Sequence, residues 1–87
     1  MKVDGVIISG DFDDEMNEFS IQKVKQFYTE STLRQSQLNL LYDYLEKHKH
    51  EEGGQFITLY DQLPVHLSQD EIYQLLNDLK KVKEFYH

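Results

Sequence analysis

The feature that most constrains this chain is a strongly signalled helix between Leu67 and Tyr86. Ser68 and Glu71 have the spacing of a capping box, in which each side chain accepts a hydrogen bond from the other residue's backbone N–H. Leu67 before the cap and Ile72 at the fourth helical position have the spacing of a hydrophobic staple. These local signals predict a helix that begins at the Ser68 cap.

The interior of this segment repeats apolar residues every three or four positions, which places them on one side of a helix. The repeating residues are Ile72, Leu75, Leu76, Leu79 and Val82. Acidic residues stand in the first turn and three lysines in the last turns, as the helix dipole favours. The pattern predicts an amphipathic helix that packs on a core.

A second helix is predicted from Thr32 to about His50. Thr32 and Gln35 repeat the capping-box spacing, with Thr32 as the cap. Leu38, Leu41, Leu45 and His48 continue one side of the helix. Gly53-Gly54 then marks its end, because glycine is the residue that most readily terminates a helix.

The first thirty residues favour β-structure. Val3–Ser9 is rich in β-branched residues and predicts a strand, and Asp11–Glu15 predicts a turn or exposed loop. Phe19–Tyr28 suits a strand that pairs back on Val3–Ser9, and its apolar spacing suits a helix nearly as well. A hairpin is favoured because β-branched and aromatic residues dominate this segment.

Phe56–Tyr60 predicts a short strand, and Asp61–Pro64 predicts one helical turn or a tight connection. A chain of 87 residues can build one modest core. We therefore expect a single α+β domain over 1–87. Its N-terminal part, 1–30, is a β-hairpin or a strand plus helix, and 31–87 forms a helix–strand–helix part.

From Thr32 onward, the order of long helix, diglycine, short strand, brief helical turn and capped helix resembles a winged helix-turn-helix domain. In that resemblance Thr58–Leu63 is the short second helix and Ser68–Glu84 is the recognition helix. The family pattern continues with a β-hairpin wing, whereas only Phe85, Tyr86 and His87 follow the third helix here. The resemblance implies that the N-terminal segment supplies the missing sheet partners.

The charge is strongly negative, with 16 acidic residues against nine lysines and arginines and a formal net charge of −7. This balance repels nucleic acid and anionic membranes and attracts basic partner surfaces. Five acids fall within eight residues: Asp11, Asp13, Asp14, Glu15 and Glu18. They indicate a solvated loop, a patch that docks a basic partner, or a patch that imitates a phosphate backbone and blocks such a partner. A calcium-binding EF-hand is excluded, because Met16 and Gln22 stand where that loop needs glycine and glutamate.

The chain shows no pattern of catalytic or metal-binding residues. It has no cysteine, and its four histidines do not follow the ligand spacings of zinc sites. Ser68 is explained as a cap, and Gly53-Gly54 lacks the lysine and spacing of a phosphate-binding loop. We expect no cofactor, no metal and no enzymatic activity. The lack of a long apolar run or a secretory signal predicts a cytoplasmic protein that does not enter a membrane.

The tyrosines are too many for so small a core, and exposed tyrosines often mark protein interfaces. We therefore expect a protein-interaction or regulatory module that docks a basic partner or forms a homodimer. The expected partner-binding residues are Asp11, Asp13, Asp14, Glu15, Glu18, Tyr42, Tyr44 and Tyr73.

The alternative is a degenerate winged-helix DNA-binding transcriptional regulator. Its base-reading residues would be Gln69, Gln74 and Asn77, and its phosphate-binding residues Lys80, Lys81 and Lys83. This alternative ranks second for two reasons. Asp70, Glu71 and Asp78 would face the phosphates, and Arg34 is the single arginine in the chain.

Overall fold

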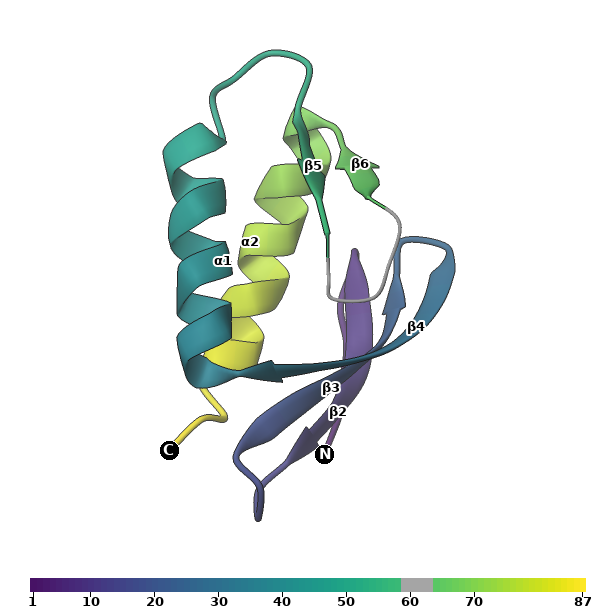
Figure 1. Ribbon diagram of the computed structural model, residues 1–87, viewed down its shortest axis with the longest axis vertical. Coiled ribbons are helices and arrows are strands. Elements are labelled where there is room, and N and C mark those ends of the chain that lie inside the picture. Colours follow the sequence, from purple (N-terminus) through teal and green to yellow (C-terminus); the bar gives the residue numbers. More distant parts are fainter. Residues whose placement is uncertain (59–63) are drawn as a thin grey trace.

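Buried and exposed side chains alternate along β-strands within the first 34 residues. The two helices follow these strands in the chain (Figure 1). The structure, a computed structural model, describes residues 1–58 and 64–87. The described elements in chain order are β1 Lys2–Asp4, β2 Ile8–Asp13, β3 Glu18–Val24, β4 Phe27–Arg34, α1 Gln35–His48, β5 Gln55–Ile57, β6 Val65–Leu67 and α2 Gln69–Lys83. The prediction of an α+β fold is confirmed.

The four N-terminal strands form an antiparallel sheet in the order β1-β2-β3-β4. The prediction of β-structure for 19–28 was right in kind but wrong in extent, because β3 ends at Val24, a turn follows at 25–26, and β4 begins at Phe27. The predicted Val3–Ser9 strand is divided as well, since β1 ends at Asp4 and β2 begins at Ile8, and β3 pairs with β2 on one side and with β4 on the other. The predicted turn at Asp11–Glu15 was wrong at its start. Phe12 is buried in the core, so β2 continues to Asp13, and the turn comprises residues 14–17.

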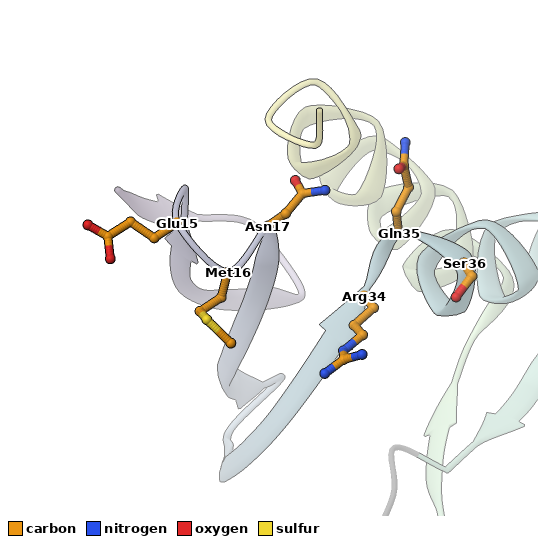
Figure 2. A pocket seen from close by; sticks show the side chains of 6 residues that line it. All are labelled: Glu15, Met16, Asn17, Arg34, Gln35 and Ser36. Carbon is orange, nitrogen blue, oxygen red and sulfur yellow. The ribbon is translucent and has the colours of Figure 1, made fainter.

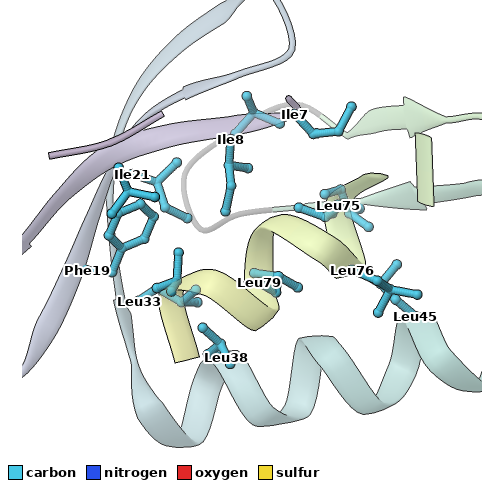
Figure 3. Close-up of a cluster of buried hydrophobic side chains, with 14 of the residues drawn as sticks. Ile7, Ile8, Phe19, Ile21, Leu33, Leu38, Leu45, Leu75, Leu76 and Leu79 are labelled. Carbon is cyan, nitrogen blue, oxygen red and sulfur yellow. The ribbon is translucent and has the colours of Figure 1, made fainter. Parts of the chain in front are cut away.

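One face of this sheet packs on α2, with α1 beside α2 (Figure 3). Phe19, Ile21 and Leu33 point from the sheet toward Leu79 and Leu38 of the helices. The core joins both halves of the chain and comprises Val3, Ile7, Ile8, Phe12, Phe19, Ile21, Val24, Leu33, Leu38, Leu45, Ile57, Leu67, Ile72, Leu75, Leu76, Leu79, Val82 and Tyr86.

The predicted features of α2 are confirmed. The Ser68 hydroxyl accepts from the Glu71 N–H, and the Glu71 carboxylate accepts from the Ser68 N–H at 2.9 Å. Leu67 and Ile72, the two members of the predicted staple, are fully buried.

The predicted start of α1 was wrong. Thr32 lies in β4, because the alternation of buried side chains in that strand continues through Leu33. Arg34 is the N-cap residue, and its backbone N–H donates to the Gln37 side chain at 2.8 Å. The helix ends at His48, slightly before the predicted His50.

The segment between the helices contains a small hairpin. β5 covers the start of the predicted 56–60 strand, and it pairs with β6 from Gln55 opposite Leu67 to Ile57 opposite Val65. β6 was not predicted, because three residues are too few to show alternation. Residues 59–63, which include Tyr60 and most of the expected second helix, lie outside the described residues. The winged-helix resemblance stays a prediction.

Candidate functional site

The sheet face that points away from the helices is the candidate site, and we call it the open face. Its side chains alternate with the buried ones on all four strands, and among the described residues no helix packs on it. The open face comprises Lys2, Asp4, Ser9, Asp11, Asp13, Glu18, Ser20, Gln22, Lys23, Tyr28, Glu30, Thr32 and Arg34.

Three of the predicted acidic residues meet on this face. Asp13 stands directly opposite Glu18, a like-charge cross-strand pair of the kind that destabilises a sheet. The Arg34 Nε atom lies 3.6 Å from a Glu18 carboxylate oxygen, and most of the Arg34 side chain is exposed. Asp11 stands opposite Lys2 on β1 and accepts a hydrogen bond from Gln22 at 3.1 Å. The excess of carboxylates gives this part of the face a negative field.

Hydrogen bonds fix the conformation of the turn at residues 14–17, which contains Asp14 and Glu15. Asp13 Oδ1 accepts from the backbone N–H groups of Glu15 and Met16 at 3.0 and 3.1 Å. Asn17 has a positive φ of 54°, which asparagine tolerates better than most residues. Its side chain donates to the His87 carbonyl at 2.6 Å and accepts from the His87 N–H at 3.0 Å.

A depression of about 420 Å³ lies over the middle of β3 and β4. It is next to the irregularity in the pairing between Ile21 and Lys23, where the two strands lose their regular register. Its lining residues are Ser20, Ile21, Gln22, Glu30, Ser31 and Thr32. Hydroxyls, an amide and one carboxylate suit a hydrogen-bonding or cationic side chain.

A second depression, of about 540 Å³, lies where the 14–17 turn approaches the start of α1 (Figure 2). Its lining residues are Glu15, Met16, Asn17, Arg34, Gln35 and Ser36. The side chains of Glu15, Arg34 and Gln35 point in different directions from its rim, so it is an open hollow (Figure 2). Among the described residues no three His, Cys, Asp or Glu side chains are grouped to hold a metal ion.

The predicted tyrosines do not join the acidic residues. Tyr44 donates to the Gln55 side chain at 2.7 Å, and the Tyr73 hydroxyl lies 3.1 Å from His50 Nδ1. The ring of Tyr42 lies under the Lys83 ammonium at 5.3 Å. All three lie on the helices and contact other parts of the fold, which leaves the acidic residues as the coherent part of the predicted site.

The residues on α2 that were predicted to bind nucleic acid fall into two groups. Gln69 donates to the Lys49 carbonyl at 3.1 Å and so links the two helices. The other candidates, Gln74, Asn77, Lys80, Lys81 and Lys83, are exposed. Asp78, which we expected to face the phosphates, is instead buried against the sheet.

The open face also contains residues that the sequence interpretation did not single out, among them Asp4, Tyr28 and Glu30. The alternation of FYTESTLR in β4 was the signal that could have found the last two. It was overlooked because Thr32 was interpreted as a helix cap. Tyr28 is 83% exposed, an unusual position for an aromatic ring.

No protein family, no curated protein and no solved structure matches this chain. Within the part of the chain that the structure describes, no helix is long and apolar enough to cross a membrane.

Proposed function

We propose that this protein is a non-catalytic interaction module that binds a basic segment of another protein on its open face. The observation that supports this most directly is that, within residues 1–58 and 64–87, no element packs on this sheet face, while Asp13 and Glu18 oppose each other on it. Arg34 already lies 3.6 Å from Glu18, and a lysine or arginine from a partner that contacts both carboxylates would relieve the repulsion further.

The electrostatics favour fast but salt-sensitive binding. Asp11 and Asp13 are two residues apart on one strand, so their side chains lie about 7 Å apart on the same face. Basic residues at alternate positions of an extended partner have the same spacing. These charges are exposed to solvent, and salt therefore screens their attraction over a Debye length of about 8 Å at physiological ionic strength.

The test is binding of a fluorescently labelled peptide of six lysines, followed by anisotropy at low and at physiological salt. In the triple variant Asp11→Asn, Asp13→Asn, Glu18→Gln, we expect about tenfold weaker binding or more. The matched control carries Asp43→Asn, Glu52→Gln and Glu84→Gln, which remove the same charge from exposed positions outside the sheet. An equal loss in both variants would show that net charge alone attracts the peptide, and the proposal would be wrong.

DNA binding by α2 is the second candidate, because Gln74, Asn77 and Lys81 lie exposed along one side of that helix. It predicts binding to duplex DNA that weakens steeply with salt and is lost when Lys80 and Lys81 are replaced by glutamine. The Lys47→Gln variant on α1 is the control. Absence of DNA binding at low salt would remove this candidate and leave the first one untouched.

A further inference from the structure

The four-stranded sheet has one long outer edge, which is the side of β4 that faces away from β3 (Figure 1). The strand order places β1 and β4 at the two edges, and β1 has three residues whereas β4 has eight. The β4 sequence FYTESTLR contains neither proline nor lysine, two residues that commonly protect a long edge strand from pairing. Among the described strands of this sheet, β4 is therefore the one that can best accept another strand.

The hydrogen bond of Arg34 shows which backbone groups of β4 point outward. Its N–H donates to the Gln37 side chain at 2.8 Å, so this group points away from β3. In an antiparallel pair, the backbone groups of successive residues point alternately to the two sides of the strand. Tyr28, Glu30 and Thr32 have the same phase as Arg34, and side-chain burial alternates without interruption along these positions. Among the described residues, no hydrogen bond from outside the sheet reaches the backbone of these three.

The charges along this edge complement themselves. Glu30 and Arg34 lie on the same side of the sheet with Thr32 between them, and their charges have opposite signs. A polybasic strand would be repelled by Arg34, and a polyacidic strand would be repelled by Glu30. In an antiparallel copy of β4 the order of the two charges is reversed, so the acidic half of each copy lies beside the basic half of the other. The edge therefore fits its own sequence better than a strand of one charge.

We propose that β4 pairs antiparallel with β4 of a second copy of the chain, which gives a two-fold symmetric dimer with one continuous sheet. This inference goes beyond the proposed function and does not rest on it. When Glu30 stands opposite Thr32 of the second copy, the outward N–H and C=O groups of both residues are used in both copies. Arg34 of the second copy then lies opposite Tyr28 and diagonal to Glu30, within reach of the ring face and of the carboxylate.

The dimer leaves the open face accessible. Paired residues of neighbouring strands point to the same side of a sheet, so the open faces of the two copies form one surface. The helices of both copies lie on the other side, where each core is. Pairing through β4 and binding on the open face are therefore compatible.

Sedimentation equilibrium from about 10 μM to about 1 mM protein tests the dimer. Physiological salt is used, because a Debye length of about 8 Å then screens the net charge of −7 on each copy. Thr32→Pro removes an N–H that the pairing with β3 does not use, and edge strands tolerate proline at such positions. This variant should weaken the dimer about tenfold or more.

The matched control is Asp4→Pro on the opposite edge of the sheet. The Gly5 N–H donates to the Ile8 carbonyl at 2.8 Å, so the N–H of the preceding residue, Asp4, points outward from β1. Asp4→Pro should leave the dimer unchanged. In the wild type, hydrogen exchange of the Thr32 amide should slow with rising protein concentration, whereas exchange of the Asp4 amide should not.

Exchanging the two charges identifies the occupant as a second copy. Glu30→Arg and Arg34→Glu should each weaken the dimer about fivefold, because each brings like charges together across the two-fold axis. The double variant, which carries the two charges in the reversed order, should return to within about twofold of the wild type. A strand of another protein would not produce this rescue.

The inference is overturned if the wild type stays monomeric at about 1 mM, or if Thr32→Pro dimerises as tightly as the wild type. It is also overturned if the double charge variant is not restored. A dimer that Leu40→Ser on α1 abolishes and the β4 variants do not would assign the contact to that helix instead. Circular dichroism checks that Thr32→Pro folds, and if it does not, the charge variants decide.

Discussion

The Asp78 carboxylate accepts a hydrogen bond from the backbone N–H of Ile7 at 2.7 Å, across 71 positions of the sequence. The same carboxylate accepts from Val6 at 3.0 Å and from Ile8 at 3.1 Å, and its side chain is 1% exposed. Three consecutive donors, from the β1–β2 loop and the first residue of β2, thus satisfy one buried carboxylate on α2. This contact orients the helix against the sheet and so places the open face on the far side.

Replacing Asp78 by alanine should lower the free energy of unfolding by about 3 kcal/mol, because two buried N–H groups and one partly buried N–H group would lose their acceptor. Asp78→Asn should be intermediate, since its amide oxygen still accepts. Urea unfolding measures both effects. Asp43→Ala on the exposed side of α1 should change stability by less than about 0.5 kcal/mol. An Asp78→Ala protein as stable as this control would contradict the anchoring role.

The contribution of Glu71 to the free energy of unfolding should decrease at acid pH. The Ser68 N–H, and then the Lys25 ammonium, lower the pKa of the Glu71 carboxyl below its ordinary 4.5. Because the folded pKa is the lower one, the contribution is fully present above about pH 4.5 and is lost as pH falls through the folded pKa. Glu71→Gln should thus destabilise by about 1 kcal/mol at pH 7 and progressively less below pH 4.5. Urea midpoints from pH 7 to 2 test this, with Asp70→Asn as the control in the same helical turn.

The contribution of Tyr86 to the free energy of unfolding should decrease at alkaline pH. Burial raises the pKa of its hydroxyl from 10.0 to about 12, and this hydroxyl donates to the Leu33 carbonyl. Because the folded pKa is the higher one, the contribution is complete below pH 10 and is lost as pH rises toward 12. Tyr86→Phe should destabilise by about 1 kcal/mol at pH 7 and should flatten the decline between pH 10 and 12. Tyr28→Phe, at an exposed ring, should leave that decline unchanged.

Local signals predicted the helices better than the sheet. The cap and staple of α2 involve residues within five positions of one another, so the sequence contains them completely. Thr32 shows that such a motif is not sufficient, because its spacing also fits the end of a strand whose neighbour Leu33 is buried. Tertiary pairing with β3 decided between these two structures.

The acidic character of the candidate site was predictable from the sequence, but the arrangement of its side chains on the sheet was not. The acidic residues were recognisable from their density, and Asp11, Asp13 and Glu18 do lie on one surface. Their arrangement on a sheet depends on the register that sets Asp13 opposite Glu18, which no local pattern encodes. Tyr42, Tyr44 and Tyr73 were predicted as partner-binding residues from composition, which cannot show that the Tyr73 hydroxyl meets His50 across the helix pair.

The two glycines after α1 should differ in how strongly they resist substitution, although both have positive φ, 85° at Gly53 and 75° at Gly54. A Cβ on Gly53 would meet no atom within 4 Å, so Gly53→Ala should destabilise by about 1 kcal/mol through backbone strain alone. A Cβ on Gly54 would lie 1.9 Å from the Leu67 carbonyl oxygen, in the strand that pairs with β5. Gly54→Ala must therefore displace the β5–β6 hairpin and should destabilise by about 3 kcal/mol. Thermal unfolding of the two variants side by side measures the difference, and equal losses would show that strain, rather than the close contact with Leu67, selects glycine at both positions.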